Sequence, residues 1–436
     1  MSAADLAASY PEHVATLERA YAQILHDQRL EAVVIVAGRA AMKNRFDDQW
    51  WPLAATPTFG HWLPLREPDA ALVIAAGARP RLIRVTHDDY WDSPPVAEAD
   101  HFWASYEVID VAQAEDIAVH LPHGRVAVIA SDEPPFAVPG PINSPLLLGA
   151  VERLRTHKTA YEVACLAEAT RRAVRGHRAA AARFEAEGGS ELGLHLTYLA
   201  ASEQDDGDTP YKNIVARGHH AAVLHHVVYD KQAPAVGADS LLVDAGAACL
   251  GYASDITRTH VRGAGDDVDE FRALVGAIDR LQQQLCGEIR PGLAYEQLHD
   301  RDHELLATAL VDLGIGRGSA AELVGRGVTR ALFPHGLGHS LGLQVHDVGM
   351  KPHPPRADNR FLRNTSVIEV GQVFTIEPGC YFIDKLLAPL RADDRAGLLD
   401  WKLVDRLARF GGVRIEDDVV VGAAGVRNLT REAWAA

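Results

Sequence analysis

Five residues in the C-terminal half of the chain carry side chains that could bind a pair of divalent metal ions. They are Asp244, Asp255, His339, Glu377 and Glu416. Four carboxylates and one imidazole form a ligand set for Mn²⁺, Co²⁺ or Zn²⁺ rather than a zinc site built from thiolates. Each residue lies in a short stretch typical of a strand or a tight turn: LLVDAG, YASDITRT, PHGLGH, TIEPG and VRIEDD. The sequence therefore predicts a metal site whose ligands are carried by strands and turns.

Asp244 and Asp255 lie on the two arms of a predicted hairpin, residues 241–261. With the turn centred on Cys249 and Leu250, the two aspartates are directly opposed, with Cβ atoms about 5 Å apart. Two buried carboxylates that close repel each other and raise each other's pKa unless a positive charge lies between them. Since no lysine or arginine lies between the two aspartates in the sequence, the hairpin favours a bound divalent cation over two solvated carboxylates.

The other three candidate ligands lie at turns or on a strand. HGLGH contains His335 and His339, but it lacks the glutamate of an HExxH motif, and its two glycines argue against a helix. Glu377 follows the apolar run QVFTI and precedes a Pro-Gly pair, which places its carboxylate at a strand end. GGVRIEDDVVV puts Arg414 and Glu416 on one strand face, so Arg414 either forms a plain ion pair with Glu416 or orients it on a metal.

The remaining sequence predicts two domains, because 436 residues exceed the size at which one core keeps growing. Strand-like and helical runs alternate over residues 1–145, which indicates an α/β domain that ends in the proline-rich stretch 134–145. Residues 146–436 combine long helices with antiparallel strands, which indicates an α+β domain. A Trp-rich loop, residues 45–65, contains Asp48 and is either a packed surface connection or a cover for an active site or another subunit.

Composition and charge narrow the function classes. The formal net charge of −16 disfavours nucleic acid or an anionic membrane surface as the main partner. No apolar run approaches the roughly 18 residues of a membrane span. The four cysteines form no CxxC pair, and the first 20 residues lack a basic start followed by an apolar run. These features predict a protein of the reduced cytoplasm.

The order of the motifs resembles the pita-bread metallopeptidases, the family of prolidases, aminopeptidase P and methionine aminopeptidase. The resemblance is carried by VDAG, SDITRT, PHGLGHSLGLQVHD, TIEPG and GGVRIEDD, and the FDDQWWP loop makes the chain most similar to bacterial Xaa-Pro dipeptidases. It implies an α/β N-terminal domain followed by an α+β pita-bread (creatinase/aminopeptidase-like) catalytic domain. It further implies a homodimer that hydrolyses dipeptides with C-terminal proline, using a hydroxide shared by two divalent ions. Mn²⁺ is the expected metal, with Co²⁺ or Zn²⁺ as alternatives.

The resemblance assigns a role to each candidate metal ligand. Asp244 is expected to bind the first ion, and His339 and Glu377 the second. Asp255 and Glu416 are expected to bridge both.

It also assigns residues to catalysis. His225 and His346 match histidines that line the substrate pocket and stabilise the tetrahedral intermediate. Arg414 matches an arginine that supports the metal site, and Glu377 is expected to carry a proton to the leaving nitrogen.

The substrate pocket has three further candidates. His335 matches a histidine of the pocket wall, Arg363 an arginine that binds the substrate carboxylate, and Asp47 or Asp48 a loop acid that reaches the partner's pocket in prolidase dimers. One position departs from the family, because His226 stands where a tyrosine is usual. The missing phenol predicts weaker catalysis or a different pH profile.

Three alternatives stay open at this point. An aminopeptidase P-like enzyme would act on longer peptides, and an organophosphorus-ester hydrolase would use the same metal pair. A non-catalytic binding protein is the most distant alternative, and the presence of all five candidate ligands counts against it.

Overall fold

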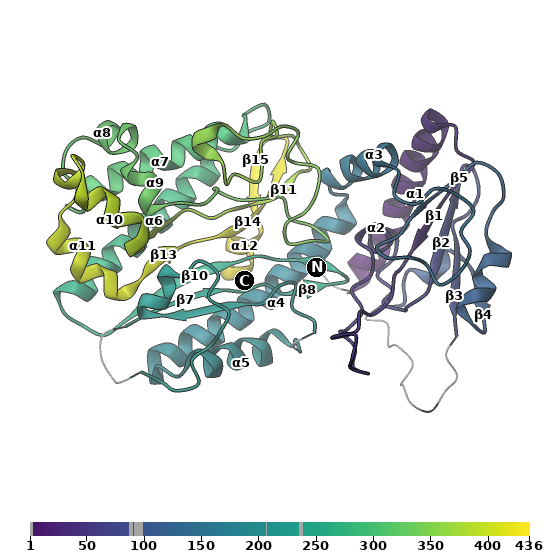
Figure 1. Cartoon of the computed structure of the whole chain (residues 1–436), viewed down its shortest axis with the longest axis horizontal. Coiled ribbons are helices and arrows are strands. Elements are labelled where there is room, and N and C mark those ends of the chain that lie inside the picture. The colour runs from purple at the N-terminus through teal and green to yellow at the C-terminus, as the bar shows by residue number, and fades with distance from the viewer. Residues whose placement is uncertain (1–2, 87–89, 91–98, 206, 235–238) are drawn as a thin grey trace. The chain divides into compact units, whose positions relative to one another are not determined.

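The computed structural model describes residues 3–86, 90, 99–205, 207–234 and 239–436. The chain divides into two compact units (Figure 1). The N-terminal unit contains residues 1–165 together with 250–252, and the C-terminal unit contains residues 166–249 and 253–436. Within the described ranges, every helix is too short or too polar to cross a membrane.

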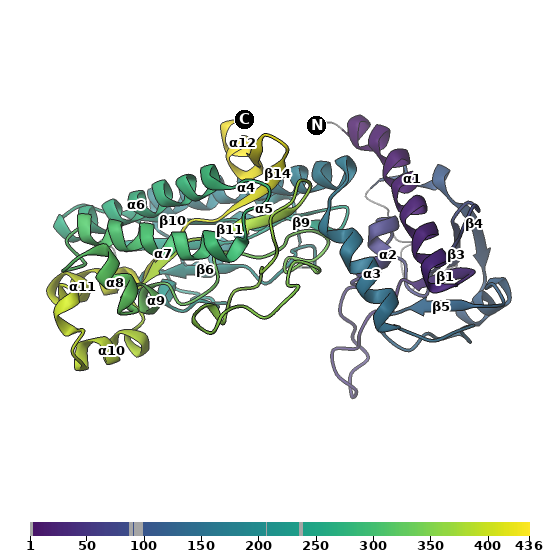
Figure 2. The ribbon, with the colours of Figure 1, turned by 90° about the horizontal axis from the view of Figure 1, so that it is seen from above.

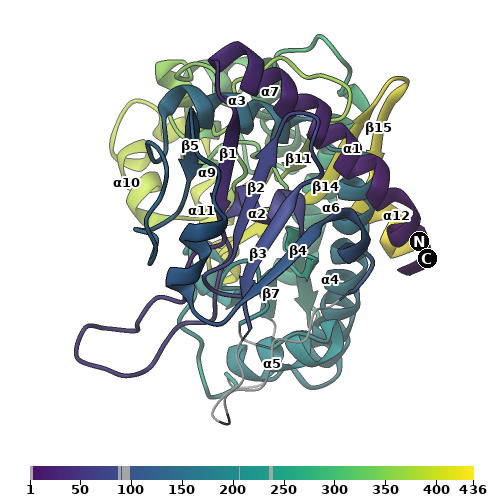
Figure 3. The same cartoon turned by 90° about the vertical axis from the view of Figure 1, so that its right-hand side faces the viewer.

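The N-terminal unit is built on a mixed five-stranded sheet with the order β4-β3-β2-β1-β5, whose strands lie side by side in Figure 3. Strands β1, β2 and β3 pair antiparallel, whereas β4 and β5 are added in parallel at the two edges. Helix α1 packs its buried residues, among them Tyr10, Leu17 and Tyr21, against this sheet (Figure 2). The elements are α1 (Ala3–Gln28), β1 (Ala32–Val36), α2 (Pro57–Trp62), β2 (Ala71–Ala75), β3 (Arg81–Val85), η1 (Trp103–Ser105), β4 (Glu107–Val111), η2 (Ala114–His120), β5 (Val126–Ile129) and α3 (Pro145–Thr156).

The Trp-rich stretch 45–65 is part core and part surface. Trp62 is fully buried in α2, and its carbonyl accepts hydrogen bonds from the hydroxyls of Tyr10 (2.6 Å) and Tyr106 (2.7 Å). Trp50 and Trp51, in contrast, are 55% and 57% exposed. The sequence did not predict which of these tryptophans are buried, because the residues around a tryptophan in a short helix do not differ from those around a tryptophan in a loop.

The C-terminal unit combines long helices with short antiparallel strands. Its strands form the sheets β10-β7-β6, β11-β14-β15, β12-β13 and β8-β9. A bridge between Thr257 and Glu416 joins the first sheet to the segment that leads into β14. Helix α6 packs against α7 and against β10, β11, β13 and β15, and it contributes Phe271, Leu274 and Ile278 to the largest apolar core.

The strands of this unit are β6 (Ile214–Arg217), β7 (Asp239–Asp244), β8 (Ala248–Cys249), β9 (Tyr252–Ala253, whose first residue is counted with the N-terminal unit), β10 (Thr257–Arg262), β11 (Val373–Ile376), β12 (Gly379–Tyr381), β13 (Gly412–Arg414), β14 (Asp417–Gly422) and β15 (Gly425–Asn428). Its helices are α4 (Ala160–Glu187, which begins in the N-terminal unit), α5 (Glu191–Ser202), η3 (Gly218–Ala222), α6 (Asp266–Glu288), α7 (Tyr295–Asp312), α8 (Ala320–Gly325), α9 (Val328–Leu332), η4 (Ala357–Asn359), α10 (Asp384–Ala392), η5 (Ala396–Leu398), α11 (Trp401–Leu407), η6 (Ala408–Phe410) and α12 (Leu429–Ala435).

The predicted hairpin forms, but its register differs from the prediction. Asp244 pairs with Thr257, not with Asp255. The turn is centred on Leu250 and Gly251, which have φ of 51° and 87°, because a two-residue hairpin turn with positive φ at both positions favours glycine. The turn therefore lies one residue further along the chain than predicted. As a result, each residue of the first arm faces a residue two positions beyond its predicted partner. A shift of two keeps Asp255 on the face that carries Asp244, because side chains alternate with a period of two.

Candidate active site

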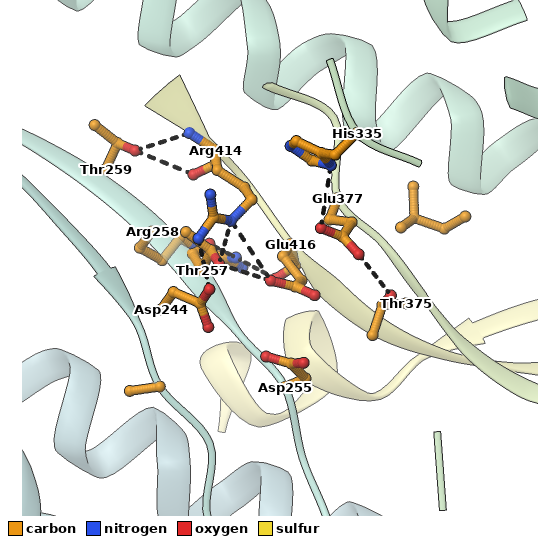
Figure 4. A network of polar contacts seen from close by, with 12 residues as sticks. Asp244, Asp255, Thr257, Arg258, Thr259, His335, Thr375, Glu377, Arg414 and Glu416 are labelled. Atoms are coloured by element: carbon orange, nitrogen blue, oxygen red, sulfur yellow. Dashed lines mark hydrogen bonds and ion pairs between the residues drawn. The ribbon is translucent and has the colours of Figure 1, made fainter. Parts of the chain in front are cut away.

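Strand ends and adjoining segments bring the five candidate ligands together in the C-terminal unit. Asp244 ends β7, Asp255 lies just before β10, Glu377 follows β11, and Glu416 lies between β13 and β14. Figure 4 shows these four carboxylates turned toward a common space. Asp244, Asp255 and Glu416 are buried, and the side chain of Glu377 is 15% exposed.

His339 completes this group. Its Nε2 lies 3.4 Å from Asp255 Oδ2, 3.6 Å from Glu377 Oε1 and 3.9 Å from Glu416 Oε1. Its Nδ1 lies 3.1 Å from the carbonyl oxygen of Ser340, which can only accept a hydrogen bond. Nδ1 therefore carries the proton of the neutral ring, and the lone pair of Nε2 faces the carboxylates, as it does in a metal-binding histidine.

The HGLGH segment holds His339 by pairing with β11, and it is not helical, as the two glycines predicted. The backbone N–H of His339 donates to Thr375 Oγ1 (3.1 Å), and its carbonyl accepts from the backbone N–H of Thr375 (2.9 Å). Gly338 makes this approach feasible, because a Cβ at this position would lie 2.1 Å from the carbonyl oxygen of Thr375 and 2.4 Å from the hydroxyl of Tyr295.

Tyr211 links the two aspartates of the hairpin. Its hydroxyl lies 2.7 Å from Asp244 Oδ1 and also contacts Asp255 Oδ1. Burial, followed by the charges of Asp244 and Asp255, raises the pKa of Tyr211 well above its usual range, so the phenol stays a donor. Tyr211 was not predicted as a site residue, because nothing in EQDDGDTPYKN distinguishes it from an ordinary loop tyrosine.

Arg414 is the buried cation beside the carboxylates. Its guanidinium donates to Asp244 Oδ2 (2.5 Å), to the hydroxyl of Tyr381 (2.8 Å) and to Thr257 Oγ1 (3.1 Å). Thr257 Oγ1 in turn donates to Glu416 Oε2 (2.6 Å), whereas the direct distance from Arg414 Nε to Glu416 Oε2 is 4.0 Å. Arg414 thus orients Asp244 directly and Glu416 through a hydroxyl, and its predicted role in orienting Glu416 on a metal stays a prediction.

The carboxylates outnumber the cations that face them. Burial, followed by the charge of Asp244, raises the pKa of Asp255 well above its usual range. Burial, followed by the charges of Asp255 and Glu377, does the same for Glu416. Burial also raises the pKa of Glu377 to about 7, although His339 and Arg414 oppose the rise. Such a cluster takes up protons or binds cations.

The donor set fits a metal centre. Ligand atoms of Asp255, His339 and Glu416 all lie within 4.8 Å of one another, and Asp244 and Glu377 adjoin this trio on its two sides. Hard oxygen donors with one imidazole suit Mn²⁺, Co²⁺ or Zn²⁺. The residues therefore have both the chemistry and the proximity to hold divalent ions.

A cavity of about 800 Å³ opens onto these ligands, and its lining includes the predicted pocket residues His225, His335, His346 and Arg363. The ring of His346 meets that of His339 edge-on, with centroids 4.4 Å apart. His335 Nε2 lies 2.8 Å from the Tyr381 hydroxyl, and its Nδ1 lies 3.6 Å from Glu377 Oε2. The apolar part of the cavity wall consists of Leu224, Val227, Val345, Phe361, Ile383 and Leu386.

Two residues singled out in the sequence lie elsewhere. His226 is absent from the described residues that line the cavity, and its Nε2 lies 2.8 Å from Glu191 Oε2. The predicted effect of the missing phenol, weaker catalysis or a different pH profile, stays a prediction. Asp48 belongs to the N-terminal unit and accepts a hydrogen bond from Gln49 Nε2 (3.0 Å), and its contact with a partner's pocket stays a prediction.

Comparisons with known proteins identify the family. The family "Metallopeptidase family M24" matches residues 164–423, and "Xaa-Pro dipeptidase, N-terminal domain" matches residues 8–143. An Xaa-Pro dipeptidase of Marinobacter nauticus is 42% identical over 426 residues, which cover 97% of each chain. An Xaa-Pro dipeptidase of Xanthomonas axonopodis pv. citri is 40% identical and covers 99% of each chain.

Solved structures are similar in fold. Zn-substituted Escherichia coli aminopeptidase P in complex with product superposes with a TM-score of 0.72 at 22% identity, covering 98% of this chain and 95% of that one. Pseudomonas aeruginosa aminopeptidase PepP gives a TM-score of 0.74 at 23% identity, with the same coverage. The predicted fold class, an α/β domain followed by a pita-bread catalytic domain, is confirmed. The chain belongs to metallopeptidase family M24 and, within it, to the group of bacterial Xaa-Pro dipeptidases.

Proposed function

We propose that this protein is an Xaa-Pro dipeptidase, which hydrolyses dipeptides whose second residue is proline. The observation that carries the proposal is the convergence of four carboxylates and the Nε2 lone pair of His339 at one wall of a cavity. The other walls offer histidines, a cation and apolar side chains, which a small charged peptide needs. Relatives that are 37–42% identical over nearly the full chain carry the name Xaa-Pro dipeptidase.

The residues that would hold two divalent ions are Asp244, Asp255, His339, Glu377 and Glu416. Mn²⁺ is the proposed native metal, because four of the five ligands are hard oxygen donors. When bound, such ions polarise a carbonyl group and lower the pKa of a water ligand from about 15.7 toward 7.

The chain's own residues then act on the substrate. Burial, followed by the charges of His339 and Arg363, lowers the pKa of His346 to about 3, so its imidazole is neutral near pH 7. A neutral ring can donate its N–H to a carbonyl oxygen on which negative charge develops. Glu377, whose carboxylate lines the cavity, can accept a proton and release it to the leaving nitrogen.

The residues that line the pocket suit a substrate with proline in the second position. An Xaa-Pro bond has no N–H, so the substrate must be held by its ring and its carboxylate instead. Phe361, Ile383 and Leu386 offer apolar surface for the pyrrolidine ring. Arg363, which is exposed at the cavity, offers a positive charge for the carboxylate.

Three further properties belong to the same proposal. The protein acts in the cytoplasm, its domains divide at residues 145 and 146, and it forms a homodimer. The exposed Trp50 and Trp51 beside Asp48 support a role of this loop at another subunit. Light scattering in solution measures the dimer directly, and a mass equal to one chain at micromolar concentration would disprove it.

Purified protein loaded with Mn²⁺ is expected to release proline from Leu-Pro and Ala-Pro. A tripeptide Xaa-Pro-Xaa should be rejected, which separates this activity from that of an aminopeptidase P, and Leu-Gly controls for a general dipeptidase. An organophosphorus ester tested in the same assay measures the second alternative. Full metal occupancy without turnover of Leu-Pro would refute the proposal.

Arg363→Met tests the carboxylate site. A hydrogen bond to a charged group contributes about 1.5–3 kcal/mol, so KM for Leu-Pro should rise roughly 10- to 150-fold with metal content unchanged. Arg409→Met, at an exposed arginine outside the cavity, is the matched control. An unchanged KM in Arg363→Met would remove this residue from the pocket.

A further inference from the structure

Glu191 is a buried carboxylate that lies outside the candidate metal centre and begins helix α5. Four N–H groups converge on it. Oε1 lies 2.9 Å from the backbone nitrogen of Arg217 and 2.7 Å from His220 Nδ1. Oε2 lies 2.8 Å from the backbone nitrogen of Asp230 and 2.8 Å from His226 Nε2.

These contacts use the full hydrogen-bond acceptor capacity of the carboxylate. An ionised carboxylate offers about four lone-pair sites, and here each oxygen receives two donors. Burial opposes the charge of Glu191, but the hydrogen bonds from Asp230, Arg217 and the two histidines outweigh it and lower its pKa. The rings of His220 and His226 also stack on each other, with centroids 4.3 Å apart. Glu191 is thus an ionised carboxylate that accepts four hydrogen bonds and fixes the positions of their donors.

The donors belong to one stretch of chain, residues 217–230, which we call the pocket segment. Glu191 holds its first residue, its last residue and two histidines between them. A further hydrogen bond, from the backbone N–H of Leu192 to the carbonyl of Asp230 (3.1 Å), secures the same end to α5. Within this segment, Leu224, His225 and Val227 line the active-site cavity.

His225 is exposed at the cavity and directly precedes His226. A side chain so exposed has few packing contacts to fix it, so its position depends on the backbone that carries it. That backbone is held one residue away by the contact of His226 with Glu191.

We propose that Glu191 is a positioning residue that fixes His225 in the substrate pocket through His226 and the ends of the pocket segment. The expected change in kcat/KM rests on the proposed dipeptidase function. The expected change in the position of His225 does not. Glutamine at position 191 would replace one acceptor oxygen by a donor that faces two N–H groups, and it would release one side of the segment. A displacement of about 1 Å in such a wall can cost up to 100-fold in rate.

Four variants test the proposal kinetically. Glu191→Gln and His226→Phe are each expected to lower kcat/KM for Leu-Pro by about 10- to 100-fold. His226→Tyr restores a donor toward Glu191 and should stay within about threefold of the wild type. His219→Ala is the matched control, because His219 is exposed and its ring contacts that of His220 in a tilted arrangement (centroids 4.4 Å apart).

A double-mutant cycle separates positioning from general damage. In a His225→Ala background, Glu191→Gln should have almost no further effect on kcat/KM, because the group it positions is gone. Effects that add in full would overturn the proposal. Metal content, measured in parallel, should be the same in His226→Phe as in the wild type. One ion fewer in His226→Phe would instead identify Glu191, His220 and His226 as a metal site and would also overturn it.

The ring resonances of His225 give a readout that does not require activity. In histidine-labelled protein, the ¹H–¹³C signal of His225 should shift in Glu191→Gln and His226→Phe but not in His219→Ala. An unmoved signal would refute the positioning role. If the wild type fails to cleave Leu-Pro while the His225 signal moves as expected, only the proposed function is wrong.

Discussion

Asp255→Asn should have opposite effects on the stability of the metal-free protein and on its affinity for metal. Asp255 is buried, shares the hydroxyl of Tyr211 with Asp244, and faces His339 Nε2 at 3.4 Å. Burial and the charge of Asp244 raise its pKa in the folded protein well above its usual range, which is about 3.9 in an unfolded chain. The substitution keeps the shape of the side chain and removes its charge.

The sign of the stability change follows from proton linkage. A carboxyl with a raised folded pKa holds a proton that the unfolded chain releases, so stability falls as pH rises from about 4 toward the folded pKa. A buried polar group that lacks a suitable partner costs about 1–3 kcal/mol. At about 2–4 °C per kcal/mol for a domain of 150–250 residues, the metal-free Asp255→Asn protein should melt roughly 2–12 °C higher at pH 8. The gain should vanish near pH 4.

The metal effect has the opposite sign. An ion at 100 times its Kd stabilises the folded state by about 2.7 kcal/mol, and an ion at its Kd by only about 0.4 kcal/mol. A 100-fold loss of affinity in Asp255→Asn would therefore remove most of the Mn²⁺-induced rise in Tm, together with activity.

Scanning calorimetry in EDTA and in Mn²⁺, at pH 4.5 and pH 8, measures both effects. Asp269→Asn is the control, since Asp269 forms an exposed pair with Arg272 at 2.5 Å, and such pairs contribute only about 0–1 kcal/mol. The reasoning fails if metal-free Asp255→Asn is less stable than the wild type at pH 8, or if the gain is equal at both pH values. It also fails if the Mn²⁺-induced shift is unchanged.

Three other substitutions probe the surroundings of the site. Gly338→Ala places a Cβ 2.1 Å from the carbonyl oxygen of Thr375, so the HGLGH segment must shift. Calorimetry should show lower stability, and metal titration should show weaker binding. Unchanged metal binding would contradict the role of Gly338 in placing His339. Tyr211→Phe removes the donor shared by Asp244 and Asp255 and should cost the metal-free protein about 1–3 kcal/mol by denaturant unfolding, with most of the loss recovered in Mn²⁺. Asp302 is buried with no hydrogen-bond partner in the described part of the chain, and burial raises its pKa. Asp302→Asn should therefore raise the free energy of unfolding by about 1–3 kcal/mol at pH 8 and by little near pH 4; equal gains at both would contradict it.

The sequence pointed to the five candidate ligands, which the structure brings together, because local chain features mark their positions. Glu377 follows an apolar run and precedes a Pro-Gly pair, and the glycines of HGLGH exclude a helix around His339. The hairpin face was also predictable, since Asp244 and Asp255 share a parity that a shift of two residues preserves. The turn centre was not, although Gly251 was the available signal, because glycine tolerates the positive φ that the turn requires.

Long-range contacts could not be predicted in the same way. The guanidinium of Arg414 reaches Asp244 across 170 positions of the chain. Tyr211 and Glu191 act through partners that no local pattern connects to them. Such contacts depend on how elements pack in three dimensions, and a single sequence contains no periodicity that reports them.

Two adjacent aspartates on β14 show what the structure adds to a pattern of charged residues. Asp417 and Asp418 are both fully buried and point to opposite faces of the strand. Burial alone would raise the pKa of Asp417, but Arg258 and Arg431, whose nitrogens lie 2.6 Å and 2.7 Å from it, outweigh burial and lower that pKa.

Among the residues that the structure describes, none forms an ion pair with Asp418. It accepts hydrogen bonds from Thr170 Oγ1 (3.2 Å) and from the backbone N–H of Asp255 (3.1 Å), and burial together with the charge of Asp255 raises its pKa. Asp417 is therefore an ionised carboxylate paired with two arginines, and Asp418 places a further buried carboxyl group directly behind a candidate metal ligand. A stable interior pairs its charges, and the C-terminal unit does so closely at Asp417, whereas at Asp255 and Glu416 burial and neighbouring carboxylates outweigh the cation Arg414. Asp255 and Glu416 line one cavity, and Asp418 contacts the backbone of Asp255 from behind. Divalent cations compensate such a group of neighbouring carboxylates.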